Sequence, residues 1–133
     1  MTIALVSLPA RAANVQEVLS PLGIKAWLVE DYTVPIVTMN VAFLGGAAQD
    51  PDGKAGLSNL MSGLLDEGAG DLDSRAFQAR LEDLSINLNF DSSSDAFYGN
   101  LRTLKQNTEE AFELFRSALT EPGPHLLQAV LRS

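Results

Sequence analysis

The 133-residue sequence contains no cysteine and only one histidine. The absence of cysteine excludes disulfides, thiol catalysis and cysteine-ligated zinc. A lone histidine, His125, cannot assemble a metal site by itself. It lies between Pro124 and Leu126, and we expect it in a surface loop. Serines such as Ser58 have no base to activate them, because no histidine lies near them in the sequence. We therefore expect neither a thiol nor a serine nucleophile.

Basic residues are also scarce. Nine Lys and Arg stand against 17 Asp and Glu, which gives a formal net charge of -8 and a pI of about 4.4. Such a chain repels the phosphates of nucleic acids and the surface of anionic membranes. No apolar run reaches the roughly 20 residues that a membrane span requires. We expect no nucleic-acid partner and no membrane span.

The N-terminus lacks the basic start of a complete signal peptide. It does have a short apolar run, 3–8, followed by small residues, Ala10-Arg11-Ala12-Ala13, in an A-x-A arrangement that signal peptidases cut. We interpret residues 1–20 as the residual tail of a signal peptide, with an unstructured N-terminal arm as the alternative. This interpretation predicts a periplasmic or secreted bacterial protein, with the domain proper over residues 21–133.

The sequence after residue 20 alternates between strand and helix patterns. Two strands over 23–31 and 34–46, joined by a turn at 31–33, predict a hairpin, with Pro35 at the start of the second strand. Asp50-Pro51-Asp52-Gly53 is a turn. Leucines at helical spacing predict a helix over 55–67 that stops at Gly68.

The second half of the chain also alternates between helix and strand patterns. Asp73 or Ser74 caps a second helix, and Asn107 with Glu110 resembles a capping box for a third. Between these helices, apolar residues alternate with polar ones in two strands around a turn at 91–95. The order is β-β-α-α-β-β-α, which predicts an α+β fold, an antiparallel sheet with helices packed on one face.

The helix predicted over 55–67 carries three residues at the spacing of a metal-binding catalytic motif. In "GLSNLMSGLLDEGAG", 56–70, the residues Asn59, Ser62 and Gly63 stand at positions i, i+3 and i+4, which share a helix face. An inverted zinc-peptidase helix places His, Glu and His there, as H-x-x-E-H: the imidazoles bind Zn²⁺ and the glutamate activates the metal-bound water. The three residues also lie off the leucine face, so we expect them to border a cleft.

The order and spacing of four segments resemble the N-terminal part of the insulinase/pitrilysin-type zinc peptidases, which include the mitochondrial processing peptidase and its bacterial relatives. These segments are "GIKAWLVED", "VPIVTMNVAFLGGAAQDPDGKAGLSNLMSGLLDEGAG", "FQARLEDLSINLNFDSSSDAFYGNLRTL" and "EEAFELFRSALTEP". The resemblance covers about three quarters of the chain, from Gly23 to Pro122. It implies the fold of that family's repeated domain, cut short at its C-terminus.

The same resemblance implies that the catalytic residues are missing. Asn59 stands for the first His, Ser62 for the Glu and Gly63 for the second His, so no zinc ligand pair and no general base remain. The third metal ligand of the family, a downstream glutamate, would fall beyond Ser133. We therefore assign no catalytic residue, no metal and no cofactor, and treat the three positions as vestigial.

The resemblance implies a non-catalytic subunit or fragment of a bacterial zinc metallopeptidase. Its expected partner is an active zinc-peptidase subunit or a second copy of itself, with peptide substrate as a further ligand. In one alternative the chain completes a peptidase whose His/Glu site lies in another chain. In another it is a homo-oligomeric structural module with no peptidase role. The acidic run "DEGAGDLDSR", 66–75, could meet a basic peptide, or it is a plain solvated loop.

Overall fold

The computed structural model describes residues 14–132, which fall into two compact units that divide between Val34 and Pro35. Residues 1–13, where the signal-peptide motif lies, and Ser133 are outside the described residues. The signal-peptide interpretation therefore stays a prediction. Within the expected N-terminal arm, however, residues 15–19 form a strand that the sequence patterns did not predict.

The first unit is a two-stranded antiparallel hairpin. Strand β1, Val15–Leu19, pairs with β2, Lys25–Val29, in a register that runs from Val15↔Val29 to Leu19↔Lys25. The turn is closed by Ser20, whose backbone N–H donates to the carbonyl of Ile24 at 2.8 Å and whose hydroxyl accepts from the N–H of Ile24 at 3.0 Å. The hairpin expected between 23–31 and 34–46 is therefore wrong, because β2 pairs with the strand before it.

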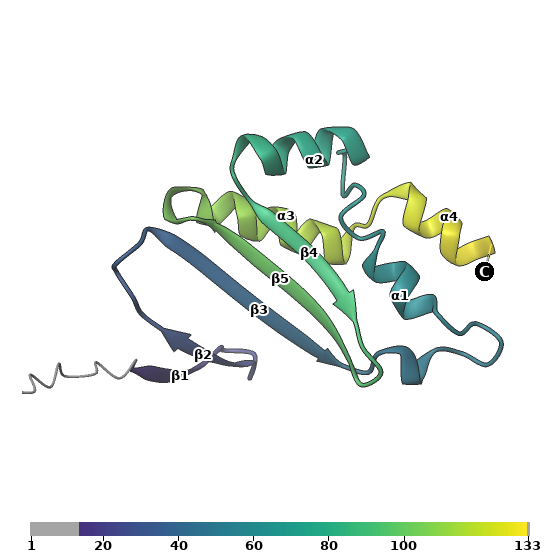
Figure 1. Cartoon of the computed structure of the whole chain (residues 1–133), viewed down its shortest axis with the longest axis horizontal. Helices are drawn as coiled ribbons and strands as arrows, with labels where there is room; N and C mark the ends of the chain where they lie inside the picture. Colours follow the sequence, from purple (N-terminus) through teal and green to yellow (C-terminus); the bar gives the residue numbers. More distant parts are fainter. Residues whose placement is uncertain (1–13, 133) are drawn as a thin grey trace, which may run out of the picture. The chain divides into compact units, whose positions relative to one another are not determined.

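The second unit contains a three-stranded antiparallel sheet in the order β3-β5-β4 (Figure 1). Its strands are β3, Ile36–Leu44; β4, Asn87–Ser92; and β5, Ala96–Leu104. β4 and β5 form the expected hairpin. β3 closes against the other edge of β5, from Ile36↔Leu104 to Leu44↔Ala96, although about 50 residues separate the two strands in the sequence.

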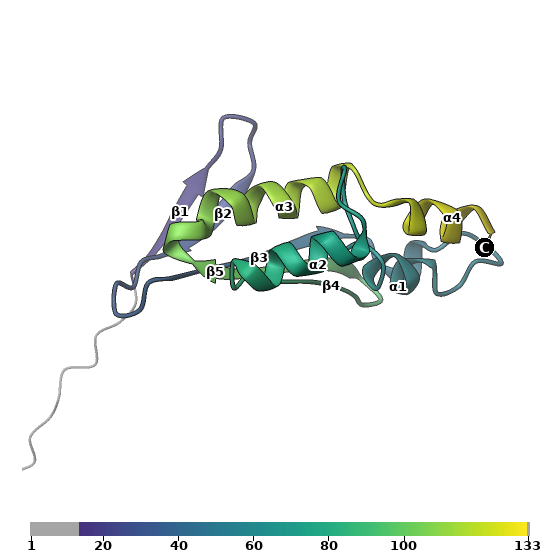
Figure 2. The same ribbon diagram turned by 90° about the horizontal axis from the view of Figure 1, so that it is seen from above.

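Helices α2 and α3 run along this sheet (Figure 2). The helices of the unit are η1, Ala47–Gln49; α1, Leu57–Ser62; α2, Ser74–Asp83; η2, Lys105–Asn107; α3, Thr108–Thr120; and α4, Pro124–Arg132. Asp73 caps α2 by accepting the backbone N–H of Ala76 at 2.8 Å, as the sequence predicted. The mixed architecture, with antiparallel strands and accompanying helices, confirms the α+β prediction.

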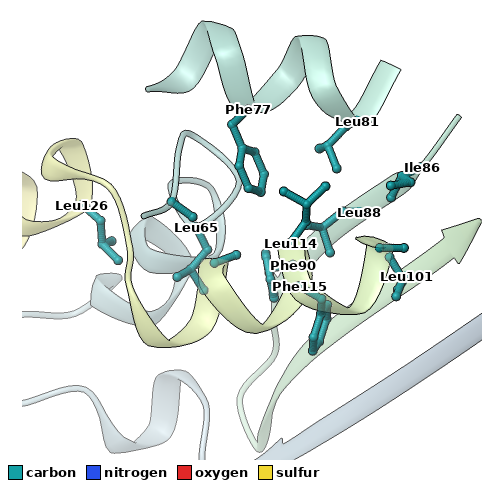
Figure 3. Close-up of a cluster of buried hydrophobic side chains, with 13 residues drawn as sticks. Leu65, Phe77, Leu81, Ile86, Leu88, Phe90, Leu101, Leu114, Phe115 and Leu126 are labelled. Atoms are coloured by element: carbon teal, nitrogen blue, oxygen red, sulfur yellow. The ribbon is translucent and has the colours of Figure 1, made fainter. Parts of the chain in front are cut away.

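The apolar core lies between the sheet and its helices (Figure 3). Phe77 of α2 is fully buried, and Phe90 of β4 stacks on Phe97 and Phe115 with ring centroids 6.1 and 5.5 Å apart. Gly99 lets Phe115 approach β5, since a Cβ there would lie 2.8 Å from its ring. The buried apolar residues that make this core are Leu65, Ala69, Phe77, Leu81, Ile86, Leu88, Phe90, Leu101, Ala111, Leu114, Phe115, Ala118 and Leu126.

The helix expected over 55–67 is shorter than predicted. α1 ends at Ser62, with Gly63 as its C-cap. The chain then continues in tight turns, in which the N–H of Leu64 donates to the carbonyl of Met61 at 3.1 Å. Gly68 is not the helix end; its φ of +117° serves a later turn. The leucine periodicity persists through these turns, which is why the pattern alone overestimated the helix.

The capping box expected at Asn107 is also wrong. The Asn107 side chain does not cap α3, because its Nδ2 donates instead to the carbonyl of Leu84, 2.7 Å away. It thereby ties the end of α2 to the start of α3. On α3 itself, Phe112 is 39% exposed, whereas Leu114 is buried.

Candidate functional site

The three positions of the degenerate motif lie on and just after α1. Asn59 and Gly63 are exposed, whereas Ser62 is only 9% exposed. The Ser62 hydroxyl donates to the backbone carbonyl of Asn59 at 2.8 Å, one turn earlier in the same helix. The expectation that all three residues border a cleft is wrong for Ser62, which points into the protein with its hydrogen bond already made, whereas Asn59 and Gly63 face outward.

These positions have room for larger side chains but offer no metal-ligand chemistry. At Gly63 the φ is -79°, and an added Cβ would come no closer than 3.8 Å to the carbonyl oxygen of Asn59. Asn59 presents a neutral amide, a weak ligand compared with imidazole or carboxylate. Over residues 14–132, no three His, Asp or Glu side chains gather closely enough to hold a metal ion. The three residues therefore do not fit a zinc centre.

The loop before α1 is fixed by one carboxylate. Asp50 accepts the backbone N–H of Gly56 at 2.7 Å, the N–H of Ser58 at 3.0 Å and the Ser58 hydroxyl at 2.5 Å. These hydrogen bonds, led by the one from the Ser58 hydroxyl, lower the pKa of Asp50 below its ordinary value. Asp50 thus accepts backbone N–H groups at the start of α1, because the N-cap residue, Gly56, has no side chain that could accept them.

This arrangement predicts a pH effect that Asp50→Asn removes. Because the folded-state pKa lies below the unfolded one, the contribution of Asp50 to stability is present above the unfolded pKa and disappears as the pH falls through the folded value. We expect D50N to lower the melting temperature at pH 7. In a plot of melting temperature against pH, the fall on the acid side should be shallower for D50N than for the wild type. Asp52→Asn, in the same loop, is the control. Equal acid sensitivity in D50N and the wild type would contradict the assignment.

The acids after α1 are less solvated than expected. Asp66 and Glu67 are both half-buried. Burial raises the pKa of Asp66 above its ordinary value, and Glu67 accepts the hydroxyl of Ser74 at 2.5 Å. The backbone carbonyl of Asp66 also accepts from Gln78 Nε2 at 2.8 Å. This acidic segment therefore connects α1 to α2 rather than forming a free helix end.

A groove of about 720 Å³ lies between α2 and the start of β4. Sequence reasoning missed it, although the polar residues Arg75, Gln78 and Glu82 recur at helical spacing on α2 and could have indicated a second face. These three residues line the groove together with Asn87 of β4. β4 pairs only with β5, so its other edge is free among the described residues. The groove and the free edge adjoin each other.

His125 is exposed, as expected, but it belongs to helix α4 rather than to a loop. None of the helices in the described part of the chain combines the length and the apolar character that crossing a bilayer demands.

The comparisons with known proteins agree on a fold. A crystal structure of a peptidase M16 inactive domain from Pseudomonas fluorescens superposes with a TM-score of 0.76 and 27% identity over 88% of this chain. The chain has the fold of the M16, insulinase-type peptidases. The resemblance to non-catalytic members of that family is confirmed by a curated relative, the non-peptidase homolog YmxG of Helicobacter pylori (strain ATCC 700392 / 26695), which is 30% identical over 94 residues, or 71% of this chain.

A second solved structure, a protease from Helicobacter pylori, shares the fold with a TM-score of 0.70 and 18% identity over 84% of this chain. No family model matches the sequence. The chain spans 22% of the length of the curated relative, and 29% and 27% of the two solved chains. The activities, substrates and partners of those longer proteins are therefore not established for this chain.

Proposed function

We propose that this chain is a non-catalytic, peptidase-like subunit, or a portion of one, that binds peptide or an active zinc-peptidase partner. The observation that carries the proposal is the α1 surface, where Asn59 and Gly63 face outward without a metal ligand and the Ser62 hydroxyl is engaged with the backbone. On this proposal the zinc site has been lost. The names of the two relatives, a non-peptidase homolog and an inactive domain, support it.

Peptide binding is supported by the free edge of β4 and the groove beside it. An extended peptide can add to an exposed strand edge through main-chain hydrogen bonds, while neighbouring grooves take alternate side chains. The formal charge of -8 and the exposed Glu82 and Asp91 near this edge favour a basic peptide. A predicted periplasmic or secreted location would make unfolded or processed peptides the available ligands.

The decisive measurement combines zinc analysis with peptide cleavage on the purified chain. We expect no stoichiometric zinc and no chelator-sensitive hydrolysis of a mixed peptide library. Peptide binding is measured in parallel by fluorescence anisotropy with a labelled basic peptide. A copy of the peptide that is N-methylated at every residue of its central segment has no N–H donors on either edge, so it should bind more weakly. Chelator-sensitive cleavage by the chain alone would overturn the proposal.

The partner role has its own experiment. A bacterial peptidase chain with an intact H-x-x-E-H helix, chosen from the same genome, is co-expressed with this chain, and a tag on this chain is used for purification. We expect the active chain to co-purify and its peptidase activity to rise in the complex. If it neither co-purifies nor gains activity, the partner role is excluded, and the alternative of a homo-oligomeric structural module gains support.

Restoring two histidines should restore a metal-binding pair. Asn59→His with Gly63→His places imidazoles at i and i+4, and the space at Gly63 accepts a side chain. We expect Zn²⁺ or Ni²⁺ to stabilise this double variant by about 2.7 kcal/mol when the free metal is a hundredfold above its dissociation constant. Differential scanning fluorimetry with metal titration measures the effect. The wild type and N59H alone serve as controls; equal stabilisation of all three would contradict the geometry.

A further inference from the structure

The loop before α1 contains the only aspartate in the sequence that is followed by glycine, Asp52-Gly53. An aspartyl carboxyl group can react with the backbone nitrogen of the next residue and form a five-membered succinimide ring. A side chain on that next residue hinders ring closure, and glycine has none. At the neighbouring Asp50 the reaction is excluded, because Pro51 has no N–H. The sequence therefore singles out Asp52 for this chemistry.

Asp52 and Gly53 are the two central residues of a turn. The N–H of Lys54 donates across it to the carbonyl of Pro51 at 2.9 Å, and Gly53 has a φ of +80°. Both central residues are exposed, and nothing lies within 4 Å of a Cβ built at Gly53. Within residues 14–132, no hydrogen bond reaches the Asp52 carboxylate or the N–H of Gly53. Rotating the peptide between them, which brings the two reacting atoms together, therefore breaks only the hydrogen bond across this turn.

The other aspartates that precede a small residue are held in place. Asp91 and Asp73 precede serines, and Asp95 precedes alanine. Asp91 lies within β4, which pairs with β5, and the carboxylate of Asp73 accepts the N–H of Ala76 at the start of α2. The N–H of Ala96, which would have to attack Asp95, donates to a serine hydroxyl at 3.1 Å. Ring closure at these three positions would break a sheet, a helix cap or a turn.

We propose that Asp52 is a site of spontaneous isomerisation to isoaspartate, and that the isoaspartate loosens the start of α1. In the first step the nitrogen of Gly53 bonds to the side-chain carboxyl carbon of Asp52, and the N–H proton leaves with the carboxyl hydroxyl as water. In the second step water reopens the ring. Attack at the former side-chain carbonyl restores aspartate, whereas attack at the main-chain carbonyl gives isoaspartate. No atom is gained or lost overall, and both reacting atoms belong to adjacent residues, so the reaction needs only water.

Isoaspartate adds one carbon to the main chain inside a loop that is fixed at both ends. Asp50, at one end, accepts the N–H groups of Gly56 and Ser58 at the other, at 2.7 and 3.0 Å. Between them, the carbonyl of Lys54 accepts the N–H of Leu57, the first residue of α1, at 3.1 Å. A longer main chain ahead of Lys54 displaces these acceptors from the N–H groups that they hold. The modification therefore acts on the helix that carries the degenerate motif.

Peptide mapping after several weeks at pH 7 and physiological temperature tests the isomerisation. Trypsin places Asp52, Asp73 and Asp91 on separate peptides, 26–54, 55–75 and 81–102. We expect peptide 26–54 to acquire a second chromatographic peak of unchanged mass, which endoproteinase Asp-N no longer cuts before residue 52 and which an isoaspartyl methyltransferase labels. Asp52→Glu is the matched control, because it keeps the charge but would need a six-membered ring, so it should show no second peak. Absence of isoaspartate at residue 52, or equal amounts at Asp73 and Asp91, would overturn the proposal.

Hydrogen exchange tests the effect on α1. The isoaspartate form is separated from fresh wild-type chain by ion exchange, and the two are compared by mass spectrometry. We expect the amides of α1 to exchange about fivefold faster in the isoaspartate form, the change that loss of one helix-capping hydrogen bond produces. Amides of β5 serve as the internal reference and should not change, and stored D52E should match fresh D52E. Unchanged exchange in α1 of the isoaspartate form would contradict the coupling between this turn and the helix.

Discussion

Phe77→Ala should lower the free energy of unfolding by about 3–5 kcal/mol. Phe77 is 0% exposed and projects from α2 into the core that α3 and the sheet share (Figure 3). Its removal takes away a large apolar side chain and leaves a cavity that neighbours such as Leu81 cannot fill without moving their helix. Urea unfolding followed by far-UV circular dichroism measures the loss, with protein concentration held constant.

Phe112→Ala is the matched control for this experiment. Phe112 lies on α3 but is 39% exposed, so its truncation should cost about 1 kcal/mol or less. The contrast matters because both residues are phenylalanines on helices of the same unit and differ only in how deeply they are buried. If the two variants lose the same stability, the packing of α2 on this core is not as the structure shows.

Gly46→Ala should destabilise the second unit by about 1–3 kcal/mol or more. A methyl group at this position would lie 2.1 Å from the carbonyl oxygen of Ser93 and 2.9 Å from that of Ala96. Both atoms are backbone, so no side-chain rotation can relieve the clash. The junction after β3 would have to move away from the β4–β5 turn, and the N–H of Ala47 would lose its 2.9 Å hydrogen bond to the same Ser93 carbonyl.

Gly63→Ala provides the control for glycine replacement in general. Its φ is -79° and nothing lies within 3.8 Å of an added Cβ, so the substitution should be neutral or stabilise by about 0.4–1 kcal/mol. Thermal and urea unfolding of both variants, side by side, measure the difference. A G46A variant as stable as G63A would show that the contact between the β3 end and the β4–β5 turn is not close.

Much of the second unit could be predicted from the sequence because its patterns are local. The alternation of Leu88 and Phe90 with polar residues gave β4, and Asp73 gave the start of α2. The close approach of Gly46 to the β4–β5 turn depends on residues nearly 50 positions away and was invisible in the sequence.

The candidate site was predictable in identity but not in orientation. Spacing alone placed Asn59, Ser62 and Gly63 on one helical turn. Whether Ser62 pointed outward depended on how α1 packs, and the structure turns it inward. The groove beside β4 was missed, because it forms only where α2 and β4 meet.

The sequence by itself determined which chemistry this chain lacks: it has no thiol, no histidine pair and no run of Lys or Arg, and it has an amide, a hydroxyl and a glycine at the motif positions. Tertiary structure alone decided which strands pair. β2 joins β1 and β3 joins β5, although a turn-like sequence links β2 to β3. The physical reason is that side-chain chemistry belongs to each residue, whereas the pairing of β3 with β5 depends on packing apolar side chains that lie about 50 residues apart in the chain.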